Sequence, residues 1–582
     1  MSPSRSVSAT SSAEVAGTNP RALLAVASIA VALAAADTYV VVLALTDMMT
    51  GVGVGIESLQ KATPIISGFL LGYVAVLPLI GRLADVLDRQ RILLACLAIF
   101  VVGSAITAMA SELSVLVVGR VLQGLGGGGL VPATLALVAQ LWPPGERGTP
   151  LGIVGAVQEI GSVLGPLIGA LILTIWDWRA IFWVNAVAGV ALAVAIRIVG
   201  GAPAPTTRVR PNWWRPVAVV TAVAGLIGAV LLTLALTAPS ALTSSIRWGA
   251  PFVPYGAHTS RMLTPIGVWS MIALGIALML AVLLVWRVFA SVDLPGAALI
   301  GLALGALILT FATSDPSRQV IGPLGLWLLP IAVIASGLFV WRQRVIADPL
   351  VARGVIRGRV TPALVCSLFA GTALVSIIVD IPLLAQLTIT GNTERDGALI
   401  LLRFLVAVPV GALAGGLLLR RFGPGLIAPV GFALTAAGLL VMSTWGKGSL
   451  QSASAWIVLI VVGLGIGLSI APINDAALYE ATPDQQGIVS ALVVVSRMIG
   501  MVVGLGLLTA IGLHQFYERV AGITNATDRQ IADAAIVQVQ TIFLGAAIAG
   551  FVAAAVGIAL GVRKIAVHHV LGESVPRESV ES

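Results

Sequence analysis

Apolar runs of about 20 residues recur along the chain from Ala22 to Val562, separated by short polar segments. A helix rises about 1.5 Å per residue, so each run is long enough to cross the hydrocarbon core of a bilayer. The pattern predicts about sixteen spanning helices, and hence an all-α polytopic membrane protein. We place the helices at residues 22–46, 61–81, 91–110, 113–140, 148–174, 179–199, 217–238, 264–289, 295–314, 323–342, 361–389, 398–418, 424–444, 454–476, 485–511 and 538–562.

Six ionisable side chains interrupt these apolar runs: Asp37, Arg120, Glu159, Asp380, Arg403 and Arg497. Each would cost about 2.5 to 3.5 kcal/mol at the centre of a lipid-facing helix, so we expect them to face one another or a water-filled cavity. Charges inside a membrane commonly mark an ion path or a substrate site. Because both signs occur, static ion pairs that fix the helix positions are the alternative interpretation.

Composition and charge agree with a membrane protein, since 58% of the residues are hydrophobic and only 10% are charged. Of the 33 Lys and Arg residues, 21 fall on the side that also holds both termini, and nine fall in the opposite loops. By the positive-inside rule we expect both termini to be cytoplasmic. The net charge of +8 then reflects loops that face anionic membrane lipids, and no nucleic-acid partner is expected.

Two local features have competing interpretations. Arg21, the apolar run after it and Ala34–Ala36 imitate a signal peptide, but the run stays apolar through Leu45, which favours a spanning helix. Cys96 and Cys366 both lie within predicted helices, so we interpret them as small packing residues and not as a disulfide.

The predicted helices divide into groups of six, four and six. We expect a cytoplasmic tail (1–21), an N-terminal six-helix bundle (22–200), a linker region with about four helices (201–360), a C-terminal six-helix bundle (361–562) and a second cytoplasmic tail (563–582). An even number of inserted helices keeps the bundles in the same orientation, as parallel repeats require, and substrate would pass between them. Helical sequence around the last external loop also predicts an external helical extension at 512–537.

The loop after the second predicted helix carries a small residue, an acid and two arginines at fixed spacing: Gly81, Asp85, Arg89 and Arg91. This segment resembles the cytoplasmic loop motif of the major facilitator superfamily, which implies a conformational lock. Val86, Asp88 and Gln90 depart from that motif, so we expect a weaker lock. A degraded counterpart at 415–423 lies at the equivalent place in the second bundle and supports the repeat.

Two further motifs lie inside predicted helices. The segment 119–124, which contains Arg120, resembles the arginine motif of the same superfamily, and this resemblance implies a part in proton coupling. The next helix carries a motif that resembles one shared by the antiporters of the family: Gly161, Gly165, Pro166 and Gly169. Its glycines permit close helix contact and its proline predicts a hinge. The segment 178–185 is similar to the drug/proton antiporter branch, which has extra linker helices.

Within that branch, three segments resemble the actinobacterial triacylglyceride exporters that work with a lipid-carrying lipoprotein: 37–42, 158–166 and 493–501. The resemblance implies proton-coupled export of triacylglyceride-like lipids or other hydrophobic compounds by alternating access. It also implies a location in a bacterial plasma membrane and an external lipoprotein as partner. It covers both bundles but not the middle of the chain, so the helices at 217–238 and 264–289 have no assigned role.

Counting from the helix ends gives the depth of each intramembrane charge. Asp37 and Arg120 fall at similar depth in the outer half of the first bundle, where they would pair. Asp380 and Arg403 fall in the outer half of adjacent helices of the second bundle, as a candidate cavity charge pair.

Glu159 and Arg497 fall near the midplane, one in each bundle, where they would form a bridge that opens as the bundles rock. We hypothesise that Asp37 and Glu159 take up and release protons while Arg120 and Arg497 approach and withdraw, because a nearby arginine keeps a carboxylate ionised. Protons would be the coupling ion, and no other cofactor is expected.

Other functional classes fit the sequence less well. The chain has no Gly-rich phosphate loop ending in Gly-Lys-Ser/Thr, which argues against an ATP-driven pump. Its histidines fall in loops or tails without metal-ligand spacing, which argues against a membrane enzyme: His258, His514, His568 and His569. The main alternative is a multidrug/proton antiporter for small hydrophobic or cationic drugs, and a remote one is a non-transporting scaffold of the cell envelope.

Overall fold

The computed structural model describes residues 19–54, 59–143, 145–201, 213–244, 249–255, 260–289, 293–312, 324–346, 349–351, 353–388, 393–520 and 527–561. Throughout this described part, every regular element is a helix. Fifteen of these helices are long and apolar enough to cross a membrane, and a shorter apolar helix at Leu294–Leu307 accounts for the remaining predicted span. The prediction of an all-α, multi-pass membrane protein is therefore confirmed.

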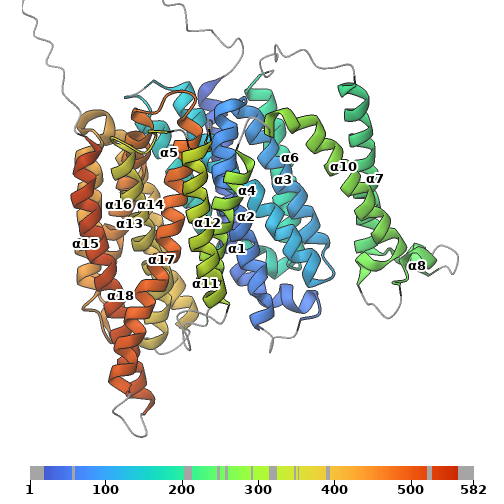
Figure 1. Ribbon diagram of the computed structural model, residues 1–582. Helices are drawn as coiled ribbons and strands as arrows, with labels where there is room; N and C mark the ends of the chain where they lie inside the picture. Colours follow the sequence, from blue (N-terminus) through green and yellow to red (C-terminus); the bar gives the residue numbers. More distant parts are fainter. Residues whose placement is uncertain are drawn as a thin grey trace, which may run out of the picture.

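Two groups of six helices form the body of the molecule (Figure 1). The N-terminal bundle contains α1 (Pro20–Gly51), α2 (Leu59–Val86), α3 (Arg89–Met109), α4 (Leu113–Leu141), α5 (Gly148–Ile175) and α6 (Arg179–Val199). The C-terminal bundle contains α13 (Val360–Thr388), α14 (Thr393–Phe422), α15 (Pro424–Met442), α16 (Ala453–Tyr479), α17 (Gln486–Val520) and α18 (Asp528–Gly557).

The same packing pattern occurs in both bundles. The first helix lies along the fifth, the second along the fourth and the third along the sixth, so that α1 packs on α5 as α13 packs on α17. Two seams join the bundles, one between α2 and α17 and the other between α5 and α14. This arrangement is what a parallel repeat about an axis along the membrane normal produces.

Side-chain caps mark several helix starts. Asn19 accepts hydrogen bonds from the backbone N–H groups of Arg21 and Ala22, which would otherwise lack partners at the start of α1. Thr527 and Gln530 form a reciprocal capping box at the start of α18.

The linker region divides into two helical pairs, together with short helical pieces. α7 (Trp214–Thr237) packs along α10 (Pro265–Phe289), and Figure 1 shows this pair standing beside the N-terminal bundle. Leu232 and Leu236 of α7 belong to the same hydrophobic cluster as Phe182 of that bundle. α11 (Leu294–Ala312) packs on α2 and also touches α17, and α12 (Gly325–Val345) packs on α11. The short pieces are α8 (Ser240–Thr243), η2 (Ala250–Phe252) and η3 (Arg261–Leu263).

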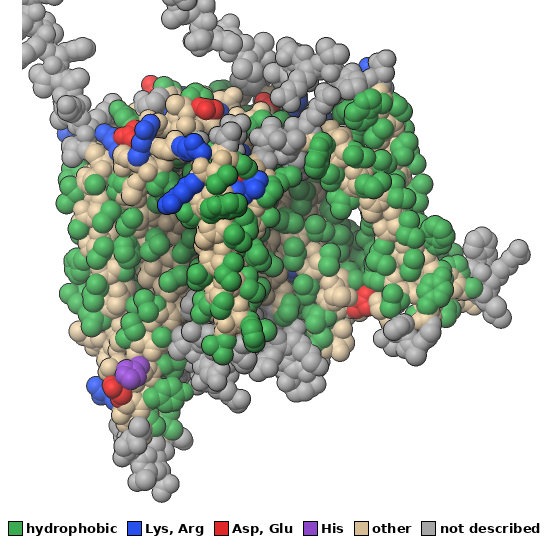
Figure 2. Space-filling view, in the orientation of Figure 1, with side chains coloured by type: hydrophobic (Ala, Val, Ile, Leu, Met, Phe, Trp, Pro, Cys, Tyr) green, Lys and Arg blue, Asp and Glu red, His purple; other side chains and the backbone are tan. Residues whose placement is uncertain are grey.

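α17 and α18 are 35 and 30 residues long, and both project beyond the neighbouring helices at the lower end of Figure 1. Near the base of this projection, Gln540 donates a hydrogen bond of 2.8 Å to the carbonyl oxygen of Trp445. Lys447 forms an ion pair with Asp533. Lys and Arg side chains gather at the opposite, upper end of the molecule (Figure 2), which we call the basic end.

The buried apolar side chains show how the bundles meet. One hydrophobic cluster contains residues of both bundles, including Leu137 of α4 and Leu478 and Leu492 near the basic end. Away from that end, each bundle has a cluster of its own, with Phe182 in one and Phe404 in the other. The bundles are therefore joined at the basic end and separate toward the other end.

Candidate functional site

Asp37 of α1 and Arg120 of α4 form an ion pair inside the N-terminal bundle. The Asp37 Oδ2 to Arg120 Nη1 distance is 2.5 Å, and the two side chains are 0% and 1% exposed. The guanidinium of Arg120 also lies over the Phe69 ring, 4.4 Å from its centroid. The structure thus brings together two residues that the sequence placed at similar depth.

Polar side chains from two more helices complete the network around this pair. Asn185 of α6 donates a hydrogen bond of 2.6 Å to Asp37 Oδ1, and Gln123 of α4 donates one of 3.3 Å to the same oxygen. Arg120 donates to Gln123 Oε1 at 3.0 Å, and Gln123 donates to Ser104 of α3 at 2.8 Å. A buried charge costs much less when its hydrogen-bonding capacity is filled in this way.

Sequence analysis did not assign roles to Gln123 and Asn185, although both lie in segments that carried a resemblance. A signal was available, because each is a polar amide inside an apolar helix, and Gln123 follows Arg120 by three residues and so lies on the same helix face.

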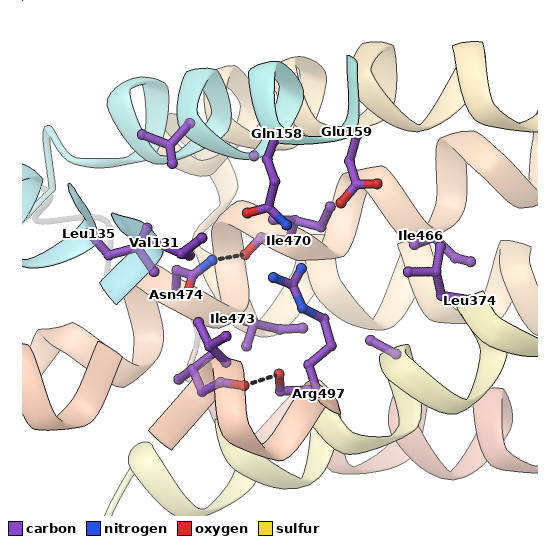
Figure 3. Close-up of a pocket in the computed structure, with 16 residues that line it drawn as sticks. Val131, Leu135, Gln158, Glu159, Leu374, Ile466, Ile470, Ile473, Asn474 and Arg497 are labelled. Carbon is purple, nitrogen blue, oxygen red and sulfur yellow. Dashed lines mark hydrogen bonds between the residues drawn. The ribbon is translucent and has the colours of Figure 1, made fainter. Parts of the chain in front are cut away.

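A second cluster of polar residues surrounds a central cavity between the bundles (Figure 3). The outline of the cavity encloses about 590 Å³, including space open to solvent, and its walls are mainly aliphatic. Five helices contribute to it: α4 and α5 from one bundle, and α13, α16 and α17 from the other. The polar side chains on its walls are Gln158, Glu159, Ser367, Asn474 and Arg497.

Glu159 and Arg497 face this cavity from opposite bundles. Figure 3 shows the Glu159 carboxylate and the Arg497 guanidinium directed toward one another across the space, with Gln158 beside them. The Glu159 side chain is buried, and Arg497 exerts a Coulomb attraction on it. No ion pair closes between these two described residues, so the expected bridge is open in this conformation.

The structure does not form the expected pair between Asp380 and Arg403. Asp380 is 2% exposed, and its Oδ2 atom has no hydrogen-bond partner among the described residues. The guanidinium of Arg403 lies over the ring of Trp456 in α16, at 3.5 Å from the centroid, and its Nη1 atom likewise lacks a partner within the described ranges. Stacking on an indole stabilises the arginine against α16. Neither residue lines the central cavity described above.

The motif predicted as a loop spans the end of α2, with Gly81 and Asp85, and the start of α3, with Arg89 and Arg91, and it links the two bundles at the basic end. Asp85 accepts hydrogen bonds from the N–H groups of Gly487 (2.6 Å) and Ile488 (3.1 Å) in the first turn of α17. A carboxylate there also interacts favourably with the positive end of the helix dipole. Arg89 donates to the carbonyl oxygen of Pro483 at 2.8 Å and to Gln486 Oε1 at 3.2 Å. We call these contacts the latch.

Two of the three departures from the family motif have local roles. Asp88 caps α3 by accepting a hydrogen bond of 3.0 Å from the backbone N–H of Arg91. Gln90 is buried and donates to the carbonyl oxygen of Ile196 at 3.1 Å, which ties α3 to the end of α6. These substitutions leave the contacts of Asp85 and Arg89 in place.

Close glycine contacts hold both seams together at the basic end. A Cβ atom on Gly487 would lie 2.1 Å from the carbonyl oxygen of Gly81, so α2 and α17 approach backbone to backbone. In the α5–α14 seam, a Cβ atom on Gly416 would lie 2.5 Å from the carbonyl oxygen of Gly148. The pathway between the bundles is closed at this end.

The glycines of the antiporter-like motif pack α5 against α1. Cβ atoms on Gly161 and Gly165 would each lie 2.4 Å from a carbonyl oxygen of α1, those of Ala32 and Ala36. One on Gly169 would lie 2.2 Å from the Val40 side chain. The predicted close contact is therefore present. The side chain of Pro166 lies outside the described residues, so the expected hinge stays a prediction.

Comparison with known proteins identifies the family. Residues 27–341 match the profile of the Major Facilitator Superfamily. A protein of Mycobacteroides abscessus named triacylglyceride transporter is 36% identical over 505 residues, which cover 84% of this chain and 82% of that protein. Its namesake in Mycolicibacterium smegmatis is 33% identical over 515 residues, covering 86% and 78%. Another, from Mycobacterium tuberculosis, is 32% identical over 522 residues, covering 87% and 85%.

Solved structures show the same fold at low sequence identity. A proton:xylose symporter has a TM-score of 0.54 at 12% identity, covering 92% of this chain and 94% of that one. The human organic anion transporter MFSD10 has a TM-score of 0.50 at 14% identity, covering 91% and 99%. The resemblance to this superfamily and to actinobacterial triacylglyceride transporters is confirmed, and both point to a transporter and not to an enzyme. The chain belongs to the major facilitator superfamily.

Proposed function

We propose that this protein exports a triacylglyceride-like lipid, or a comparably apolar compound, across the plasma membrane by proton-coupled alternating access. The central cavity supports this proposal most directly. Its aliphatic walls suit acyl chains, and its few polar side chains would orient an ester group. The names of the relatives support a lipid cargo.

Proton coupling is the second part of the proposal. Glu159 faces the cavity without a closed ion pair to Arg497, so protons can reach it when the cavity is open. When the bundles close around the cavity, Arg497 would approach and displace the proton. Asp37 and Arg120 would form the second coupling site, in which loss of the ion pair accompanies proton uptake.

The orientation follows from the charge distribution. Lys and Arg gather at the basic end, which we assign to the cytoplasm together with both termini. With this assignment, the end closed by the glycine contacts would face the cytoplasm, and α17 and α18 would project from the outer surface. We propose that an external lipid-carrying lipoprotein receives cargo at this projection.

Reconstitution tests cargo and coupling together. Purified protein is placed in liposomes with an imposed pH gradient, and movement of a labelled triacylglyceride is compared with movement of a cationic dye. We expect triacylglyceride movement that depends on the gradient and that falls to the level of protein-free liposomes in Glu159→Gln. The matched control is Gln158→Glu in the Glu159→Gln background, which returns a carboxylate to the same cavity wall one position away. Unimpaired lipid movement by Glu159→Gln would contradict the coupling role.

A multidrug/proton antiporter is the second candidate, and one observation favours it. Glu159 is a carboxylate on an apolar wall, and such a pocket attracts compounds that are both cationic and apolar. The same liposomes decide between the candidates. Gradient-driven dye movement without triacylglyceride movement would identify a drug antiporter.

A further inference from the structure

A second cavity lies at the basic end of the C-terminal bundle, apart from the central one. It lies between the segment before α13 and the α16–α17 loop, and its outline encloses about 460 Å³, including space open to solvent. Its walls are more polar than those of the central cavity. The polar side chains on them are Arg353, Arg357, Glu480, Thr482 and Gln485, and Val360 of α13 also lines the cavity.

Two arginines give this cavity its positive charge. Arg353 is held in place because its Nη2 atom donates to the carbonyl oxygens of Arg344 (2.9 Å) and Ile346 (3.0 Å). The guanidinium of Arg357 lies over Gly354, whose φ of +82° favours glycine, and a Cβ atom there would lie 3.3 Å from the guanidinium carbon. Among the described residues, Arg357 forms no ion pair or side-chain hydrogen bond, so its donors are available to a ligand.

The acidic residue on the cavity wall does not cancel this charge. Glu480 lies 4.0 Å from the guanidinium of Arg359 and also accepts a hydrogen bond of 3.4 Å from the backbone N–H of Arg359. Its negative charge is therefore shared with a third arginine. The side chains of Thr482 and Gln485 add neutral hydrogen-bonding groups to the walls.

We propose that this cavity binds a phosphate-bearing anion, and that the source of the phosphate is the headgroup of an anionic phospholipid. Arginine presents several N–H donors that match phosphate oxygens. The cavity lies at the start of α13 and beside the α16–α17 loop, and basic pockets between helices on the cytoplasmic side commonly bind anionic headgroups. α13 begins at Val360 in the cavity wall, so its dipole also favours an anion there.

This location couples the anion to the latch. The cavity and the latch use the same short loop, because Thr482 and Gln485 line the cavity while Pro483 and Gln486 accept hydrogen bonds from Arg89. An anion bound to Arg357 would fix this loop in the position that Arg89 recognises. Anionic lipid would then favour the conformation that is closed at the basic end, whichever cargo the transporter carries.

Binding is tested with purified protein in detergent by native mass spectrometry and thermal unfolding. The probes are phosphatidylglycerol, phosphatidylcholine and inorganic phosphate. We expect phosphatidylglycerol to bind and to raise Tm, and Arg357→Gln to bind it about tenfold more weakly, since one charge-assisted interaction is lost. Arg357→Lys, which keeps the charge but loses the planar set of N–H donors, should bind with an affinity between those of wild type and Arg357→Gln. The control is Arg197→Gln, which removes an exposed arginine from the last turn of α6 in the other bundle.

Three outcomes would count against the proposal. Equal phosphatidylglycerol binding by wild type, Arg357→Gln and Arg197→Gln would overturn the site. Equal binding of phosphatidylcholine would show that headgroup charge is not recognised and would overturn it too. Inorganic phosphate that raises Tm as much as the lipid would overturn the lipid as the source. None of these measurements requires transport, so they do not depend on the proposed cargo.

Discussion

Asp37 and Asp380 lie in the first helix of their respective bundles, and both are buried, yet their surroundings differ. Asp37 has an arginine and two amides as partners, from α4 and α6. Asp380 has one oxygen without a hydrogen-bond partner in the described part of the chain, and Arg403 stacks on Trp456 instead. The two sites show that a charge within a membrane helix does not by itself reveal its role, because the partners decide whether it is stably ionised.

The largest effect is expected from Asp37→Ala, which would leave Arg120 buried without its counter-ion. Removing one partner of a buried ion pair typically costs about 3 to 5 kcal/mol. Equilibrium unfolding in detergent measures the loss. The matched variant is Asp380→Ala, which removes an equally buried carboxylate but no described ion pair, and should cost about 1 kcal/mol or less. Equal losses would abolish the distinction between the two sites.

Asn185→Ala should have the next largest effect. Asp37 Oδ1 would lose its shorter hydrogen bond, and hydrogen bonds to charged groups contribute about 1.5 to 3 kcal/mol. The same unfolding assay applies. Ser376→Ala serves as the control, because the Ser376 hydroxyl donates to the Thr372 carbonyl oxygen within its own helix. A cost no greater than that of the control would mean that Asn185 contributes little to the Asp37 site.

Arg403→Gln tests whether Arg403 interacts with Trp456 in the C-terminal bundle. Loss of the stacking on Trp456 should cost about 0.5 to 1 kcal/mol. Trp456→Leu should cost a similar amount, and the double variant should cost less than the sum, because both changes remove the same interaction. Additive losses would show that the two side chains do not interact, and would make Arg403 a candidate partner of Asp380 again.

Asp380→Asn should have the smallest effect, within about 0.5 kcal/mol of wild type, because no described counter-ion is lost and an amide needs no stabilisation of charge. The same unfolding assay measures it, and Asp37→Asn is the matched comparison. That variant leaves Arg120 without its counter-ion and should be clearly less stable than wild type. A large loss in Asp380→Asn would reveal an ionised carboxylate with a partner that forms in another conformation.

The helix positions followed from hydropathy, but the full helix lengths needed other signals. α17 continues to Val520, beyond the apolar span predicted at 485–511, and this continuation falls within the helical extension that the sequence separately predicts at 512–537. Hydropathy reports the part of a helix that lies in the hydrocarbon core, whereas backbone hydrogen bonding continues through polar residues such as His514 and Glu518 beyond it. The same limit applies at Pro20–Gly51, which extends past the predicted end at residue 46.

Counting residues from the helix ends predicted the depth of each charged side chain in the membrane. It did not predict which neighbouring helix each side chain faces. Asp37 and Arg120 share both depth and direction, and they form an ion pair. Asp380 and Arg403 share only approximate depth, and the direction of Arg403 is set by Trp456, a partner distant in sequence. Gln123 and Asn185 complete the Asp37 site, but neither carries a charge, and the cost of burying a charge was the signal that singled out the six ionisable residues.

The shared hydrophobic cluster at the basic end has an energetic consequence. Opening that end to water would expose apolar side chains of both bundles, at about 2.5 kcal/mol for each 100 Å². The conformation that is open at the basic end is accessible only if a comparable apolar area is buried elsewhere. That area could be buried by contact between the outer halves of the bundles or by cargo bound between them. An apolar cargo in the central cavity would bury apolar side chains of both bundles while it is bound. Its release would expose those side chains again, and the conformation closed at the basic end would again have the lower free energy. The energy of switching would then depend on how much of the cargo is hydrocarbon.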